Sequence, residues 1–218
     1  MKNRTLALLC NLVVAVMVPV AWLLMALQLY KSGALSSAGL ASLKYFTVLS
    51  NFFNGAVSLL FVLWLLSRKE EIPRWLPLLK LMSTVAVGLT FFVVVAFLGP
   101  LYGYGSMYLG ANLWFHLLLP LISMLEFCLF DVGFSLSLRA TLSALIPTLL
   151  YGCAYAVNLL VNGVGVYPHS NDWYGFAHWG FPIGFGIFAA ILLVTWALAL
   201  LLRAGNRVAQ KRRERLSL

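Results

Sequence analysis

Residues 181–203 read FPIGFGIFAAILLVTWALALLLR, and no charged side chain occurs before Arg203. A helix crosses the hydrocarbon core of a bilayer with roughly 20 apolar residues, so this stretch is long enough to span a membrane. The apolar residues upstream are continuous and do not alternate in polarity, which favours helices over the strands of a membrane barrel. They fall into five more runs, at about residues 6–30, 44–67, 78–98, 112–130 and 141–161. The sequence therefore predicts an all-α polytopic membrane protein with six transmembrane helices.

Composition excludes the other common classes of protein. Of the 218 residues, 62% are hydrophobic and 10% are charged, whereas a soluble domain has about half apolar and a quarter charged residues. Disordered, collagen-like and disulfide-stapled chains differ as strongly from this composition. Six spans leave room for a single domain over residues 1–218, with a basic tail at 204–218. No motif of a metal or organic cofactor site occurs, so we expect neither.

The distribution of Lys and Arg predicts the orientation, because positive residues are retained on the cytoplasmic side of a membrane. With the N-terminus inside, the outer segments hold only Lys31 and Lys44. Both termini are therefore predicted to be cytoplasmic, and the loop at 162–178 external. The basic tail is expected to lie against anionic lipid heads and not to bind nucleic acid. The segments expected in the cytoplasm hold Lys2, Arg4, Arg68, Lys69, Arg74, Lys80, Arg139, Arg203, Arg207, Lys211, Arg212, Arg213 and Arg215.

Polar side chains recur at helical spacing in three of the predicted spans. Polar groups are costly in hydrocarbon, so such stripes should face protein or a wet cavity. We expect these three faces to look at one another, with the first and sixth spans outside them. The stripes are Thr47, Ser50, Asn51, Asn54 and Ser58 in the second span, Asn112, His116, Pro120, Ser123 and Glu126 in the fourth, and Thr148, Tyr151, Tyr155 and Asn158 in the fifth.

Residues of these stripes that lie at the same depth in the membrane form a candidate site. At about 1.5 Å per residue, Thr47 lies roughly 5 Å and His116 roughly 6 Å below the outer ends of their spans. Asn158 and Tyr155 lie near the outer end of the fifth span. A hydroxyl beside an imidazole is the minimum arrangement for nucleophilic acyl transfer, with the imidazole as general base. Asn51 or Asn158 would then donate to the oxyanion, and Tyr155 is a further candidate for binding the oxyanion or orienting the catalytic groups.

Each part of this candidate site also has a structural interpretation. A threonine in a membrane helix commonly bonds its own preceding carbonyl, and an intramembrane histidine can tie two helices together. The external loop is either a lid or part of an interfacial aromatic belt. If it is a lid, Asp172, His169 or His178 would orient the ring of His116.

Glu126 is expected to have a structural role. It follows His116 by ten residues, roughly 15 Å along a helix, and so lies too far away to orient the ring. A buried carboxylate needs a cationic partner, and Lys80 and Arg139 are predicted at the same side of the membrane. We therefore expect an ion pair of Glu126 with one of them.

Three segments resemble the androgen-induced and androgen-dependent TFPI-regulating family and its small bacterial relatives. They are LKYFTVLSN at 43–51, NLWFHLLLPLISMLEF at 112–127 and VYP at 166–168. The likeness extends over nearly the whole six-span chain. Mammalian members of that family are intramembrane threonine hydrolases that cleave fatty acid esters of hydroxy fatty acids. The resemblance implies that Thr47 and His116 are the catalytic pair, and its bacterial character implies the plasma membrane.

These observations together predict a membrane-embedded lipid-ester hydrolase that uses Thr47 as nucleophile, His116 as base and no cofactor. The expected partners are membrane lipids and a fatty-acyl ester near the outer leaflet. Two alternatives stay open at this stage. One is acyl transfer to a lipid alcohol through the same acyl-threonine. The other is a non-catalytic lipid-binding or transport protein that uses the same polar cavity.

Overall fold

The structure, a computed structural model, describes residues 2–29, 36–67, 71–130, 134, 136–166 and 170–216, with side chains for all of these except 2, 3 and 216. Within these ranges the regular structure is entirely helical, which confirms the predicted all-α class. Lys31, Arg68, Lys69 and His169 lie outside the described residues. Six described helices are long and apolar enough to span a membrane, as predicted: Arg4–Ala26, Phe46–Leu66, Trp75–Tyr102, Ala111–Leu129, Ala140–Asn162 and Phe181–Arg215.

Three of the spans are single α-helices, namely α1 (Lys2–Ala26), α2 (Phe46–Leu66) and α10 (Phe181–Leu216). The other three are composite. The third joins α3 (Trp75–Val93), a π-helical turn η2 (Val94–Leu98) and α4 (Gly99–Tyr102). The fourth joins α6 (Ala111–Leu113), a second π-helical turn η3 (Trp114–Leu118) and α7 (Leu119–Leu129), and the fifth joins α8 (Ala140–Ser143) and α9 (Ile146–Asn162). The connecting segments contain a 3-10 helix η1 (Gly39–Lys44) and the short α5 (Tyr104–Met107).

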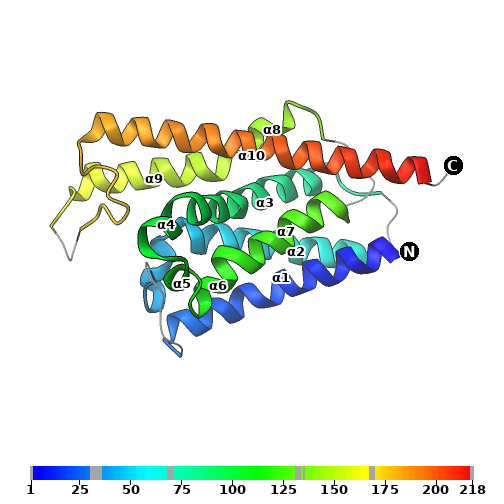
Figure 1. Cartoon of the computed structure of the whole chain (residues 1–218), viewed down its shortest axis with the longest axis horizontal. Coiled ribbons are helices and arrows are strands. Elements are labelled where there is room, and N and C mark those ends of the chain that lie inside the picture. The colour runs from blue at the N-terminus through cyan, green and yellow to red at the C-terminus, as the bar shows by residue number, and fades with distance from the viewer. Residues whose placement is uncertain are drawn as a thin grey trace.

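Helices α1, α2, α3 and α7 pack together, while α9 runs beside the first half of α10 at one side of them (Figure 1). Both chain ends lie at the same end of the bundle, and the α4, α5 and α6 segments lie at the opposite end (Figure 1). Six spans would place both ends of the chain on one side of the membrane, as the sequence predicts. The Lys and Arg distribution predicts that this side is the cytoplasm.

The contact of α1 with α2 positions the start of α2. Val14 and Val18 of α1 join Val48, Phe115 and Leu119 in one buried apolar cluster. Gly55 allows the close approach, because a Cβ at this position would lie 3.1 Å from the Cβ of Val18. The other face of α1 exposes leucine and valine side chains in the manner of a lipid-facing helix. The first span was predicted to lie outside the polar faces. This prediction holds for the exposed side of α1, whereas the opposite side packs against α2 and the fourth span.

Two helix boundaries differ from the predicted ones in ways that affect charged residues. The third span begins at Trp75 and not near residue 78, so Lys80 lies in the second turn of α3 and is 1% exposed, whereas the charge distribution grouped it with the cytoplasmic segments. Helix α10 continues to Leu216, so the described part of the basic tail is helical. Residues of types Arg, Lys, Gln, Glu and Ala are good helix formers, which explains the extension. Arg203 and Asn206 fasten it by donating to the carbonyls of Leu136 and Phe127, at 2.8 Å each.

The predicted mutual orientation of the polar stripes holds for two of the three. The Asn54 amide of α2 donates to the Ser123 hydroxyl of α7 at 2.6 Å, so these two stripes face each other. The outer part of the α9 stripe faces the loop that precedes α10 instead, because Tyr155 and Asn158 donate to Asp172 and to the carbonyl of Asn171. Tyr151 of the same stripe does meet the start of the second span, where it donates to the Lys44 carbonyl at 2.6 Å and packs against the ring of Phe46. The prediction that all three faces meet is therefore wrong for Tyr155 and Asn158 but not for Tyr151.

Candidate active site

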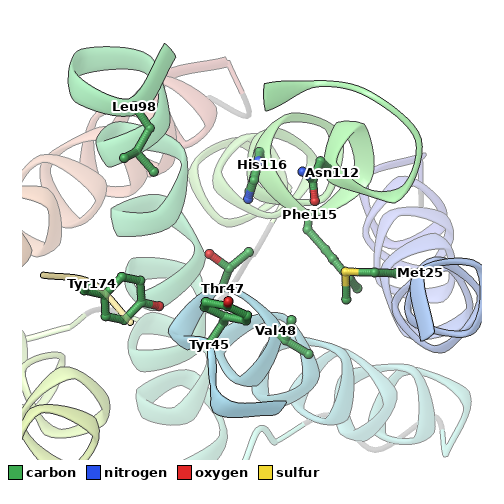
Figure 2. A pocket seen from close by; sticks show the side chains of 9 residues that line it. All are labelled: Met25, Tyr45, Thr47, Val48, Leu98, Asn112, Phe115, His116 and Tyr174. Atoms are coloured by element: carbon green, nitrogen blue, oxygen red, sulfur yellow. The ribbon is translucent and has the colours of Figure 1, made fainter. Parts of the chain in front are cut away.

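A small cavity lies at the end of the bundle that is remote from the chain ends. Its volume is about 30 Å³, which is room for one or two water molecules at roughly 10–15 Å³ each. The first four spans and the loop before α10 contribute to its lining, which mixes apolar with polar side chains. The lining residues are Met25, Tyr45, Thr47, Val48, Leu98, Asn112, Phe115, His116 and Tyr174 (Figure 2).

Thr47 is the second residue of α2 and reaches the cavity from the first turn of this helix. Its backbone carbonyl accepts hydrogen bonds from the Asn51 amide at 2.8 Å and the Ser50 hydroxyl at 3.1 Å. Its own hydroxyl makes no hydrogen bond to any residue that the structure describes. The structural interpretation, in which the threonine bonds its own preceding carbonyl, is therefore not what the structure contains.

His116 lies in the π-helical turn η3 and is only 5% exposed. Its Nδ1 lies 2.8 Å from the carbonyl oxygen of Met107. A carbonyl only accepts hydrogen bonds, so in the neutral ring Nδ1 carries the hydrogen and Nε2 keeps its lone pair. The ring is thus held in the tautomer that a general base acting through Nε2 requires.

The chain between the third and fourth spans brings Met107 to His116. Gly103 and Gly110 have φ angles of 81° and 61°, a region that glycine adopts without a steric penalty. They bracket α5, whose last residue is Met107. Both π-helical turns flank this segment, η2 with Leu98 and η3 with His116, and single π-turns within α-helices are frequent at functional sites.

Thr47 and His116 face the same cavity from opposite walls. Figure 2 shows the Thr47 hydroxyl and the His116 ring pointing into the space between α2 and the fourth span. The described contacts include no direct hydrogen bond between them. In enzymes without bound substrate, catalytic hydrogen bonds are often long and shorten only in the complex. The shared depth predicted from the sequence therefore brings the two side chains to one site.

Asn51 stabilises the site and does not donate into it. Its Nδ2 donates to the carbonyls of Thr47 at 2.8 Å and Phe115 at 3.3 Å, which links the start of α2 to η3. An amide group has two hydrogens, and both are used in these contacts. The predicted oxyanion role of Asn51 is therefore wrong in this arrangement.

Asp172 organises the loop before α10. It accepts hydrogen bonds from the Tyr155 hydroxyl and from the backbone N–H groups of Phe176 and Ala177, the last two at 2.9 Å each. The expected role of Asp172 in orienting His116 is wrong, because Met107 bonds the ring and Asp172 is occupied within the loop. Tyr155 has no oxyanion role here, because its hydroxyl donates to Asp172.

Asn158 and His178 also lie apart from the cavity. Asn158 donates to the carbonyl of Asn171 at 3.3 Å, and His178 is exposed with its ring 5.0 Å from that of Trp179. Neither residue lines the cavity with Thr47 and His116. The predicted roles of Asn158 in oxyanion binding and of His178 in orienting the His116 ring are therefore wrong. The sequence does not show to which side α9 and the loop turn.

A second polar group lies deeper in the bundle. Lys80 Nζ is 2.7 Å from Glu126 Oε2 and donates to Asn11 Oδ1 at 2.5 Å. Asn11 Nδ2 in turn donates to Glu126 Oε1 at 2.7 Å, and none of the three side chains is more than 1% exposed. The expected partner of Glu126 is thus Lys80. Arg139 is exposed before α8, where water solvates its charge, and takes no part in the pair.

Sequence reasoning missed three residues around these two groups. Met107 acts through its backbone carbonyl, so no side-chain pattern indicates it. Tyr174 belongs to the external loop, which the sequence predicted to be a lid or part of an aromatic belt without singling out this residue, and it lines the cavity. Asn11 was detectable, because it is an amide in the middle of the first apolar run.

Comparison with known proteins yields no relative, since no family model, no curated protein and no solved structure matches this chain. The function is therefore inferred from the residues that line the cavity, Thr47 and His116 among them.

Proposed function

We propose that this protein is an intramembrane lipid-ester hydrolase in which Thr47 is the nucleophile and His116 the general base. One observation carries the proposal: a histidine held in the Nδ1–H tautomer shares a buried cavity with a threonine hydroxyl that has no described partner. A nucleophile and a base facing one site are the minimum for acyl transfer. The resemblance of the segments around both residues to threonine hydrolases supports the same pair.

The reaction proceeds in two halves. His116 Nε2 takes the proton of the Thr47 hydroxyl while Oγ1 bonds to the ester carbonyl carbon. The tetrahedral intermediate collapses, the C–O bond to the alcohol breaks, and His116 returns the proton to the departing alcohol. Water then attacks the acyl-threonine, again with His116 as base, and the carboxylic acid leaves. Such a positioned base contributes roughly 10²–10⁴-fold to the rate.

The lining of the cavity and its place within the spans favour lipid esters as substrates. A volume of about 30 Å³ has no room for an acyl chain. Met25, Leu98 and Phe115 give the walls an apolar character. The acyl chains would remain in the bilayer or between helices, where apolar surface needs no hydration. Fatty-acyl esters, such as fatty acid esters of hydroxy fatty acids, fit this requirement.

A lipid-like fluorophosphonate tests the nucleophile. The purified protein in detergent is labelled, digested, and the modified residue is mapped by mass spectrometry. We expect the label on Thr47, retention of labelling in Thr47→Ser, and no labelling in Thr47→Ala or His116→Ala. Ser50→Ala is the matched control, because Ser50 is one turn away and does not line the cavity. A label on Ser50, or undiminished labelling of Thr47→Ala, contradicts the proposal.

A lipid-binding or transport function is the second candidate, and a specific observation favours it. Asn54 Oδ1, Ser58 Oγ and Thr84 Oγ1 are buried and lack a hydrogen-bond partner among the described residues. They extend the polar character from the cavity toward Lys80 and Glu126, as a path through the bundle requires. Binding without chemistry predicts no covalent adduct and only a modest loss of affinity in Thr47→Ala. Acyl transfer, in contrast, predicts the adduct and an ester product when a lipid alcohol is supplied.

The basic end of α10 is proposed to contact anionic lipid heads at the cytoplasmic face of the plasma membrane. Arg207, Lys211, Arg212, Arg213 and Arg215 follow the last apolar turns of this helix. Each such residue near an anionic surface contributes about 1 kcal/mol of attraction. In nanodiscs, phosphatidylglycerol should raise the unfolding temperature more for the intact chain than for a chain with these five residues changed to Gln. Equal shifts would exclude the contact.

A further inference from the structure

The first turn of α2 leaves backbone donors at the cavity. Its N-cap residue Tyr45 forms no side-chain cap, and its carbonyl accepts from the N–H groups of Val48 and Leu49 at 3.1 and 3.2 Å. The N–H of Phe46 donates to the Tyr174 hydroxyl at 2.8 Å. The N–H of Thr47 donates to no group in the described part of the chain. A donor beside the candidate nucleophile is thus unoccupied.

Donors in such a position match the charge that ester cleavage creates. The N-terminal turn of a helix carries partial positive charge on its free N–H groups, which favours an anionic oxygen there. In acyl transfer the carbonyl oxygen becomes negative, and donors aimed at it lower the barrier. The turn alone does not define a site. The second observation is His116, which is 5% exposed, has no described partner at Nε2, and points into the same cavity.

Tyr174 adds a side-chain donor at this place. Its hydroxyl oxygen accepts from Phe46 N–H, which leaves the hydroxyl hydrogen for another acceptor. Figure 2 shows this hydroxyl directed toward the start of α2, beside Thr47. Burial raises the pKa of Tyr174 above its usual value, so the phenol stays protonated at neutral pH. In the resting state Tyr151 is the neighbouring acceptor, because its own hydrogen goes to the Lys44 carbonyl at 2.6 Å.

We infer that the Tyr174 hydroxyl and the Thr47 N–H bind the carbonyl oxygen of the ester and stabilise its oxyanion. As Thr47 Oγ1 bonds to the carbonyl carbon, the C=O π electrons move to the oxygen, and the Tyr174 hydrogen turns from Tyr151 to this oxygen. No proton is transferred from Tyr174, so the phenol remains neutral throughout. Tyr174 is thereby a third catalytic residue. This assignment rests on the proposed hydrolase function.

The loop before α10 fixes the position of the phenol. Asp172, two residues before Tyr174, accepts from Tyr155 of α9 and from two loop N–H groups. Trp173 donates to the Tyr151 hydroxyl at 3.1 Å. The donor is thus held before substrate arrives, which is the condition under which such electrostatic stabilisation is effective.

Steady-state kinetics of Tyr174→Phe test the assignment, with Tyr104→Phe as matched control, because the Tyr104 hydroxyl donates to the Val95 carbonyl at 2.7 Å and does not line the cavity. We expect kcat of Tyr174→Phe to fall roughly 10²–10³-fold with little change in KM, the cost of one lost oxyanion donor. Tyr104→Phe should keep kcat. Tyr155→Phe removes only a contact that holds the loop, so its kcat should fall less than that of Tyr174→Phe. Equal losses in Tyr155→Phe and Tyr174→Phe would mean that Tyr174 only holds the loop, and would overturn the assignment.

A fluorinated tyrosine at position 174 tests the same point with little change in packing. Fluorine makes the phenol a stronger hydrogen-bond donor, while burial raises its pKa and keeps it protonated. We expect kcat of this variant to equal or exceed that of the unmodified protein, in contrast to the loss in Tyr174→Phe. A loss as large as that of Tyr174→Phe overturns the assignment. If Tyr174→Phe keeps full kcat while Thr47→Ala has none, the inference fails and the proposed function stands; if Thr47→Ala keeps full activity, both fail.

Discussion

The outer cavity and the buried charged group differ in how their polar atoms are satisfied. In the Asn11, Lys80 and Glu126 group, each side chain contacts both others, and all three are closed off from solvent. In the cavity, the Thr47 hydroxyl, the Thr47 N–H and His116 Nε2 have no described partner. The first arrangement stabilises the packing of α1, α3 and α7. The second leaves three groups of Thr47 and His116, two residues that line one cavity, without a described partner.

This difference separates structural from functional use of intramembrane polarity. An unsatisfied buried polar group costs about 1–3 kcal/mol, so a fold tends to keep such groups only where a ligand meets them. A buried ion pair contributes little net stability, yet loss of one partner leaves an uncompensated charge. Substitutions in the cavity should therefore lower turnover, whereas substitutions in the charged group should lower the stability of the fold.

The largest expected effect is on catalysis. Thr47→Ala and His116→Ala should each lower kcat by roughly 10³-fold or more, and the double variant should be hardly worse, because a nucleophile and its base act as one unit. Both proteins should remain folded and inserted, as gel filtration in detergent would show. Thr47→Ser should keep part of the activity, because the hydroxyl is retained. Additive losses in the double variant would mean that the two residues act separately.

The largest effect on stability is expected at the charged group. Lys80→Met should lower the free energy of unfolding by about 3–5 kcal/mol, because Glu126 is left charged and buried. Glu126→Gln should likewise lower stability more than turnover per folded molecule. Lys80→Met combined with Glu126→Leu should recover much of the loss. Arg139→Met is the control and should stay within about 0.5 kcal/mol. A stable but inactive Glu126→Gln protein would instead assign Glu126 to the chemistry.

A smaller loss is expected at Asn11, which bridges the pair. Asn11→Leu removes the hydrogen bonds to Lys80 and Glu126 and a third one to the Ala7 carbonyl within α1, but leaves Lys80 and Glu126 in contact. The expected loss is about 1–3 kcal/mol, between those of the charge substitutions and of a surface change. Thermal unfolding in detergent measures it. A loss as large as that of Lys80→Met would show that the amide, and not the ion pair alone, holds α1 to the bundle.

The substitution with the smallest expected effect on activity and stability tests which side of the membrane the cavity faces. Ser170→Cys places a thiol in the loop before α10, at the same end of the bundle as the cavity. An impermeant thiol reagent should label it in intact cells, after Cys10, Cys128 and Cys153 have been replaced by Ala. Labelling only after the membrane is opened would reverse the predicted orientation and the assignment of the cavity to the outer leaflet.

The sequence predicted most of the fold because one physical requirement, apolar length, determines each span. It also predicted that Thr47 and His116 share one site, because the depth of each residue in the membrane follows from counting residues along its span. It failed for Asn158 and Asp172, because depth does not reveal to which side a helix or loop turns. Met107 was beyond sequence reasoning, because a backbone carbonyl has no side-chain signature. The lone Asn11 in an apolar run was a signal that could have been used.

The most direct test of the central claim is the mass of the protein during turnover. The purified protein is mixed with a fatty-acyl ester, quenched with acid, and its intact mass is measured before the modified peptide is mapped. We expect a mass increase equal to one acyl group, located on Thr47, and a longer-lived adduct in Thr47→Cys. Thr47→Ala should show neither adduct nor product. Ester hydrolysis that persists in Thr47→Ala without any adduct would contradict the threonine mechanism.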